Sequence, residues 1–185
     1  MQAVERMETE RLRLRRPARE DAPAIFERYA CDPAVTRYLL FRPLTRLSEA
    51  EEFVKNCIQS WEQGSAYTWL IESRDTSRLL GAITARVEGH RVDLGYVLAR
   101  DSWGQGYMTE AVKAVVSWAF AQPEVYRVQA YCDLDHSASR HVMEKAGMQR
   151  EGVLRRWVVF PNLGDFPRDC TLYSIVRSEA KERLC

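Results

Sequence analysis

The chain has 185 residues, a hydrophobic fraction of 46% and a formal net charge of +1, from 27 basic and 26 acidic side chains. Its length and apolar content fit one globular domain at 1–185, with a core of about 10–178. The charge balance gives no electrostatic reason to expect nucleic acid or a membrane surface as a partner.

The cysteines and the first residues indicate the kind of environment the protein occupies. The five cysteines are an odd number and contain no C-x-x-C pair, so we expect neither a disulfide framework nor a zinc ribbon. The opening MQAVERMETE lacks the apolar segment of a signal peptide. No apolar run approaches the roughly 20 residues that span a bilayer. We therefore expect a cytoplasmic protein.

The first half of the chain predicts two helices and one strand. Leu12 and Leu14 alternate with arginines, which predicts a half-buried strand at 11–16 with its arginines in solvent. A capping box at Ser48–Glu51 predicts the start of a helix that ends at Gly64. The predicted elements are, in order, a strand at 11–16, a helix at 19–30, an irregular stretch at 37–47 and a helix from 48.

The second half predicts a sheet with one helical crossover. The elements are strands at about 66–73, 79–87 and 91–99, a helix at 107–121, a strand at 125–132, a helix at 137–146, and strands at about 148–160 and 170–177. The crossover through 107–121 makes its flanking strands parallel. We expect an α/β (α+β) fold, with a mixed, mostly antiparallel sheet of about seven strands flanked by about four helices. The strand at 170–177 is expected to be an exposed edge that could pair in a homodimer.

The most informative segment is 92–112, where a strand-like run leads through Trp103-Gly104-Gln105-Gly106 into a helix. Such a turn places unpaired backbone N–H groups at a helix N-terminus, which is an anion site suited to a phosphate or pyrophosphate. The lysine of a P-loop is absent. A dinucleotide fingerprint stays open as a rival, although Thr109 occupies its third glycine position. A tight turn without a ligand is the other alternative.

Four separated blocks carry a resemblance to the GNAT superfamily of acetyl-CoA-dependent N-acetyltransferases, and within it to the RimJ/RimL type. Asp101–Gly106 resembles the pattern [QR]-x-x-G-x-[GA], with Asp in its first position. The block from His136 to Arg155 resembles N-x-A-S-x-x-V-x-E-K-x-G-F followed by E-G-x-x-R. Glu8–Arg15 and Asp169–Tyr173 fit as well. The resemblance implies a single N-acetyltransferase domain with a GNAT-like sheet whose two central parallel strands splay apart.

The resemblance also implies how acetyl-CoA is held. The pantetheine arm would pair with backbone groups left open near Val97 and Leu98 between the splayed strands. The Leu98 N–H would polarise the thioester carbonyl. The pyrophosphate would bind the glycine turn and the start of its helix, that is Trp103, Gly104, Gln105, Gly106, Tyr107 and Met108.

The resemblance assigns further roles around the reacting atoms. Ser139 is the candidate acid for the departing thiolate, because the tyrosine of many GNAT enzymes is replaced by Met143. His136 stands where the family has Asn, and we expect it to contact the cofactor. Asp93 is the candidate base, acting through water, although an α-amine with a pKa near 8 needs little help. Glu110 is expected to complement the helix N-terminus.

Acceptor recognition is expected on the stretch 33–47 and on the C-terminal hairpin. The candidate acceptor residues are aromatic or basic: Tyr38, Phe41, Arg42, Trp69 and Trp157. They would suit a protein N-terminal α-amine, with a small-molecule amine as the close alternative. A non-catalytic acyl-CoA-binding module is a further alternative. His136 and His141 are not spaced to share one helix face, so no metal site is expected.

Overall fold

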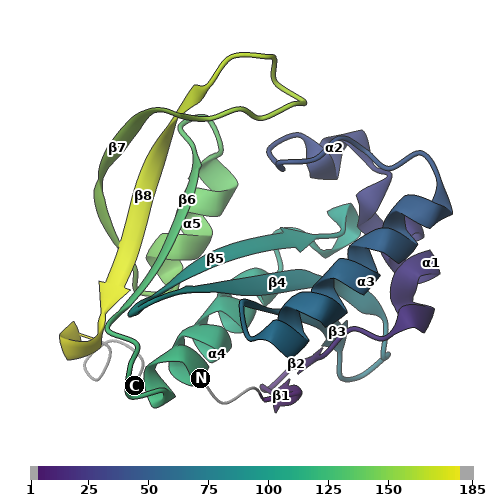
Figure 1. The fold of residues 1–185 in the computed structure, drawn as a ribbon, viewed down its shortest axis with the longest axis horizontal. Helices are drawn as coiled ribbons and strands as arrows, with labels where there is room; N and C mark the ends of the chain where they lie inside the picture. Colours follow the sequence, from purple (N-terminus) through teal and green to yellow (C-terminus); the bar gives the residue numbers. More distant parts are fainter. Residues whose placement is uncertain (1–3, 180–185) are drawn as a thin grey trace.

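Eight strands form one sheet in the order β1-β2-β3-β4-β5-β6-β8-β7 in the computed structural model, which describes residues 4–179 (Figure 1). The strands are β1 Arg6–Glu8, β2 Leu12–Arg15, β3 Ala66–Ser73, β4 Leu79–Glu88, β5 Arg91–Leu98, β6 Arg127–Asp133, β7 Gln149–Val158 and β8 Arg168–Val176. Among the strands of the described range, only β5 and β6 pair in parallel. The mixed, mostly antiparallel sheet is therefore confirmed, with eight strands rather than about seven, because the three-residue β1 was not predicted.

The helices lie on both faces of this sheet (Figure 1). They are α1 Ala22–Ile25, α2 Pro33–Thr36, α3 Leu47–Gln63, α4 Tyr107–Ala121 and α5 Ser137–Lys145, with 3-10 turns at Arg19–Asp21 and Arg100–Ser102 and a π-helical segment at Phe26–Ala30. The predicted helix at 107–121 is confirmed. The predicted helix at 19–30 is divided into 3-10, α and π segments, and the stretch after it contains the short α2.

The start of α3 differs from the predicted capping box. The helix begins at Leu47, after Arg46 in extended backbone, so Ser48 lies inside it. The Glu49 carboxylate accepts hydrogen bonds from the backbone N–H groups of Thr45 at 2.8 Å and Arg46 at 2.9 Å. The box at Ser48–Glu51 is therefore wrong, because Glu49 caps the helix from the N3 position.

Two hydrophobic clusters show which side chains of the sheet face which helices. One cluster contains Val112 of α4, Met143 of α5 and Leu94 of β5. The other contains Val54 of α3 and has Val97 of β5 packed against it. Side chains alternate along a strand. Leu94, Tyr96 and Leu98 therefore face α4 and α5, whereas Asp93, Gly95 and Val97 face the opposite side.

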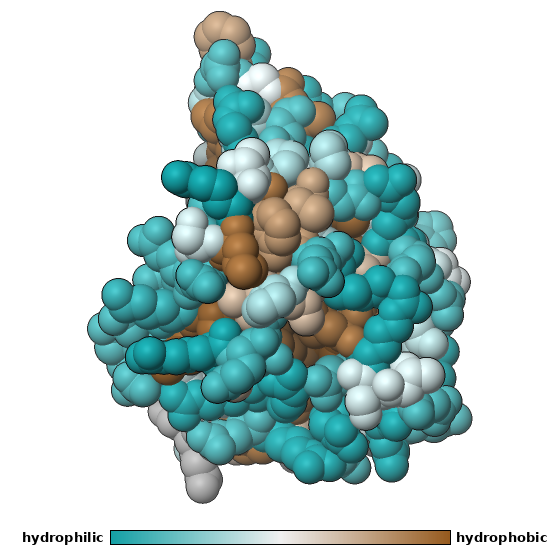
Figure 2. All heavy atoms as spheres, turned by 90° about the vertical axis from the view of Figure 1, so that its right-hand side faces the viewer, coloured by the Kyte–Doolittle hydropathy of each residue, from teal (hydrophilic) through white to brown (hydrophobic). Residues whose placement is uncertain are grey.

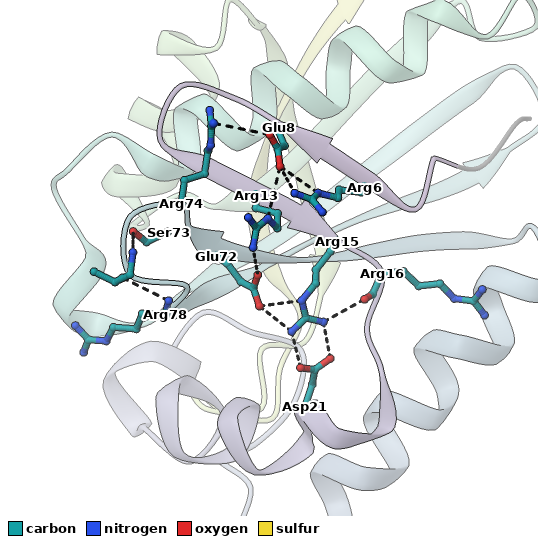
Figure 3. A network of polar contacts seen from close by, with 11 residues as sticks. Arg6, Glu8, Arg13, Arg15, Arg16, Asp21, Glu72, Ser73, Arg74 and Arg78 are labelled. Atoms are coloured by element: carbon teal, nitrogen blue, oxygen red, sulfur yellow. Dashed lines mark hydrogen bonds and ion pairs between the residues drawn. The ribbon is translucent and has the colours of Figure 1, made fainter.

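The arginines of β2 do not simply point into solvent, as the alternation had suggested. Leu12 and Leu14 are fully buried as expected. Arg15 binds Asp21 with two hydrogen bonds of 2.6 and 2.8 Å and Glu72 at 2.8 Å, within a wider network of charged side chains (Figure 3). This network fastens the edge of the sheet to the 3-10 turn that precedes α1.

The C-terminal hairpin corrects the prediction of an exposed strand edge. β8 lies between β6 and β7, and pairs with both over most of its length. The predicted edge at 170–177 is thus internal to the sheet, and β7 is the outer strand. Within 4–179 no helix is long and apolar enough to cross a membrane. Cys31, Cys57, Cys132 and Cys170 are free thiols, while Cys185 lies outside the described residues.

Candidate active site

The central parallel strands pair at one end and separate at the other. Their register ends where Asp93 pairs with Gln129. Beyond that point β5 continues beside β4 to Leu98, and β6 continues beside β8 to Asp133. The two strands therefore form a fork that opens after Asp93, as the predicted splayed pair requires.

The backbone of β5 directs alternate residues into this fork. The Ala99 N–H donates to the Leu80 carbonyl on the β4 side at 2.8 Å. Because backbone groups alternate in direction along an antiparallel strand, the amide of Leu98 faces the fork and that of Val97 faces β4. The prediction of open backbone groups at Val97 is therefore wrong, whereas the Leu98 N–H points where it was expected. The Leu98 carbonyl accepts from Trp103 Nε1 at 2.9 Å.

The glycine turn lies directly after this end of β5. Gly104 and Gly106 have φ angles of 74° and 80°, which side chains with a Cβ rarely adopt. Gly106 is the N-cap of α4 and offers no side chain to its amides. The turn residues are exposed, and Met108 is the first of the helix to be buried. Free N–H groups at a helix N-terminus form a site for an anion.

Two carboxylates hold the glycine turn against the rest of the fold. Asp101 accepts from Arg28 at 2.8 and 3.0 Å and also binds Arg78, and the hydrogen bonds from Arg28 lower its pKa to about 2. Asp101, which occupies the first position of the glycine motif, thus binds two arginines. Glu110 accepts from the Thr9 hydroxyl at 2.6 Å and from the Arg11 backbone N–H at 2.9 Å. It joins α4 to the β1–β2 turn, a partnership that helix polarity did not suggest.

Ser139 lies on α5 beside the fork, with a neighbour that sequence reasoning missed. Its Oγ is 2.8 Å from the hydroxyl of Tyr96 on β5; Ser139 is buried and Tyr96 is partly buried against the core. Burial raises the pKa of Tyr96, so its phenol keeps its proton at neutral pH. The pair forms a short chain of two hydroxyls. The alternation of Leu94, Tyr96 and Leu98 along β5 is the sequence pattern that could have placed Tyr96 on this face.

His136 is the N-cap residue of α5 and stacks on Tyr38 from the segment after α2. Their ring centroids are 4.3 Å apart and their planes differ by 10°. Burial lowers the pKa of His136, which favours the neutral imidazole. The structure therefore joins a residue predicted for the cofactor to one predicted for the acceptor. Met143, which has no proton to donate, is fully buried in the core.

Around the fork, no helix within residues 4–179 lies over the sheet face opposite α4 and α5 (Figure 1). We call Arg86, Asp93, Gln129, Tyr131 and Trp157 the open face. Arg86 and Asp93 are cross-strand partners, and Asp93 accepts from Gln129 Nε2 at 2.6 Å. The ring of Trp157 contacts Tyr131 edge-on at 6.0 Å and is half exposed. Asp93 and Trp157, both predicted site residues, are thus brought to one surface.

Two other predicted acceptor residues, Phe41 and Arg42, lie near the β7–β8 loop. Phe41 and Arg42 belong to the segment after α2, which Asn162 of the β7–β8 loop holds by donating 2.8 Å hydrogen bonds to the carbonyls of Thr36 and Phe41. Arg42 lines a groove of about 590 Å³ between these two segments.

Seen from the α1–α2 side, apolar side chains gather in a hollow near the centre of the molecule, bordered by hydrophilic ones (Figure 2).

The prediction of Trp69 as an acceptor residue is wrong, because its side chain is completely buried. Its ring packs edge-on against Trp118 at 4.8 Å and Trp61 at 5.2 Å, and its Nε1 donates to the Val4 carbonyl at 2.8 Å. It is a core residue and touches no acceptor surface. Among residues 4–179, no group of three His, Cys, Asp or Glu side chains could hold a metal ion.

Comparisons with known proteins agree with this geometry. A family model described as an acetyltransferase (GNAT) domain matches residues 11–149. YoaA of Bacillus subtilis (strain 168), described as an uncharacterized N-acetyltransferase, is 33% identical over 174 residues, covering 92% of this chain and 96% of YoaA. A GNAT-family acetyltransferase from Bacillus anthracis superposes with a TM-score of 0.82 at 25% identity, covering 94% of this chain and 99% of that one.

A third similarity concerns fold alone. RimL, a ribosomal alpha-N-protein acetyltransferase solved with coenzyme A, superposes with a TM-score of 0.83 at 21% identity, covering 93% of this chain and 98% of RimL. The family match spans most of the chain, and its residues include β5, the glycine turn and Ser139. The chain therefore belongs to the GNAT family of acetyltransferases.

Proposed function

We propose that this acetyltransferase binds acetyl-CoA in the β5–β6 fork and transfers the acetyl group to a protein N-terminal α-amine. The observation that carries the proposal is the succession of an open fork, an exposed glycine turn and the α4 N-terminus within one short stretch. The turn would hold the pyrophosphate, and the Leu98 N–H would pair within the fork. RimL, solved with coenzyme A, shares this fold.

The chemistry is a direct attack of a neutral amine on the thioester carbonyl. The C–N bond forms, and negative charge develops on the carbonyl oxygen, where the Leu98 N–H would stabilise it. The C–S bond then breaks and the thiolate takes a proton. Ser139 would donate that proton, and Tyr96, whose hydroxyl is 2.8 Å from the Ser139 Oγ, would stabilise the serine oxygen. The proton lost by the amine would pass to water or to Asp93.

An α-amine suits this site better than a lysine side chain does. Its free pKa is near 8, so an attacking neutral fraction exists at neutral pH without a strong base. Asp93 accepts a 2.6 Å hydrogen bond from Gln129 and lies 3.6 Å from Arg91, so its carboxylate already has two partners. The open face beside it includes the half-exposed ring of Trp157, against which a polypeptide would lie.

The test is amine-dependent release of free thiol from acetyl-CoA, combined with mass spectrometry of the acceptor. The panel of acceptors contains peptides with a free α-amine and the same peptides with a blocked α-amine and a free lysine. It also contains polyamines and amino acids. The proposal expects thiol release and a single acetyl group on the α-amine of the unblocked peptides. Transfer only to small amines would overturn the peptide assignment, and transfer to none would overturn the catalytic one.

A further inference from the structure

Arg86 differs from the other charged side chains around the open face. Arg91 binds Glu88 and is 3.6 Å from Asp93, and Arg127 binds Glu151 at 2.6 and 2.7 Å. Arg86 makes no ion pair or side-chain hydrogen bond within the range 4–179, and it is exposed. Its charge is therefore available to a ligand at this face.

The position of the guanidinium is set by a glycine. Arg86 pairs with Asp93 across the β4–β5 register, yet its end lies over Gly95, two residues further toward the opening of the fork. A Cβ at position 95 would be 3.0 Å from Nη1 and 3.4 Å from Nη2 of Arg86. Glycine at this position leaves the space that the guanidinium occupies, directly beside the part of β5 that leaves β6.

The charge of Arg86 also reaches the β6 side of the open face. Burial raises the pKa of Tyr131, and the positive charge of Arg86 opposes that rise. Tyr131 in turn contacts Trp157 edge-on. A cation with an aromatic wall beside it, at the opening of the fork, is a combination that binds a carboxylate in a defined orientation.

We propose that Arg86 is a specificity-determining residue that binds a carboxylate of the acceptor, lying within about 10 Å of the amine that is acetylated. The limit follows from the three residues that separate Gly95 from Leu98, at about 3.3 Å for each residue of a strand. The inference rests on the proposed function and narrows its substrate class. In a peptide, the group is the side chain of Asp or Glu within the first three residues. In a free amino acid it is a carboxyl group of the molecule.

The test compares acceptors that differ only in one charge. C-terminally amidated peptides Ser-Asp-Ala-Ala-Ala and Ser-Asn-Ala-Ala-Ala are assayed with the full-length enzyme and saturating acetyl-CoA, alongside free glutamate and glutamine. The enzymes are wild type, Arg86→Gln, Arg86→Glu and the control Arg19→Gln, which removes an exposed arginine from the 3-10 turn before α1. Binding of each peptide to the CoA-loaded protein is measured by calorimetry in parallel.

The wild type and R19Q should prefer the acidic acceptor by about fivefold in KM, the size of a partly exposed ion pair. R86Q should lose that preference through a raised KM for the acidic acceptor, and R86E should reverse it. A preference limited to the peptides or to the amino acids would identify the source of the carboxylate. An equal preference in wild type and R86Q overturns the inference. If no amine is acetylated, the proposed function fails, and the calorimetric preference still decides the role of Arg86.

Discussion

The ring of Tyr38 stacks on the imidazole of His136, with centroids 4.3 Å apart, and so joins the segment after α2 to the start of α5. The two segments come from opposite sides of the fork, and Asn162 fastens the β7–β8 loop to the same region. The stack therefore fixes the surroundings of the fork through two aromatic rings.

The His136 contact predicts a pH dependence of stability. Burial lowers the pKa of His136 from its ordinary 6.5, so the unfolded chain binds a proton more readily than the folded one. This side chain therefore reduces the free energy of unfolding as the pH falls below 6.5. Urea unfolding at pH 7.5 and 5.5 should show a smaller acid-induced loss for His136→Asn than for wild type. An equal loss in both proteins would contradict the account.

The Ser139–Tyr96 pair predicts a coupled effect on turnover. Ser139→Ala and Tyr96→Phe should each lower kcat by about a hundredfold, at the lower end of the effect of losing a proton donor or its partner. The affinity for CoA should change little. Because the two hydroxyls are in contact, the double variant should be no worse than the poorer single one.

The pair is tested by single-turnover kinetics of all three variants over pH 6–9, with calorimetry for CoA affinity. Additive losses in the double variant would show that the hydroxyls act separately. Unchanged kcat in Ser139→Ala would remove the serine from the reaction.

The glycine turn predicts a selective effect on cofactor binding. Gly106→Ala places a Cβ at a φ of 80°, which costs about 1–3 kcal/mol or shifts the turn. The matched control is Gly89→Ala, at a φ of 60° in the β4–β5 turn, where an added Cβ meets nothing within 4 Å. Calorimetry should show weaker acetyl-CoA binding for G106A only. Equal affinity in both variants would separate the turn from the cofactor.

The burial of Trp69 predicts a loss of stability without a change in specificity. Trp69→Phe should lower the free energy of unfolding by about 1–3 kcal/mol, because the core loses volume and the Val4 carbonyl loses its donor. Denaturant unfolding measures this loss, and acceptor KM values should stay as in wild type. A raised acceptor KM in a stably folded W69F would restore Trp69 to the acceptor site.

The sequence predicted the elements whose signals are local. Strong apolar periodicity located α4, and the alternation of Leu12 and Leu14 located β2. The glycine turn was visible because positive φ angles need glycine. Contacts between distant segments carry no such signal. No local sequence pattern predicts that Tyr96 contacts Ser139 or that the Arg86 guanidinium lies over Gly95. None predicts that other aromatic rings enclose Trp69.

The same limit explains the corrected edge strand. Strand order in a sheet depends on which strands meet after folding, and β8 lies between β6 and β7 although it follows both in sequence. Its run of buried residues, Cys170, Thr171, Tyr173, Ser174 and Ile175, is that of an internal strand. That pattern could have indicated burial on both faces before the topology was known.

The central claim is that the fork and its glycine turn bind acetyl-CoA, and a thermal-shift titration of the wild-type protein tests it most directly. Acetyl-CoA, CoA and NADH are compared in parallel, because a ligand at 100 times its Kd stabilises by about 2.7 kcal/mol. The account predicts a rise in Tm with both CoA species and none with NADH. A rise in Tm with NADH alone would contradict it, and so would the absence of a rise with all three ligands.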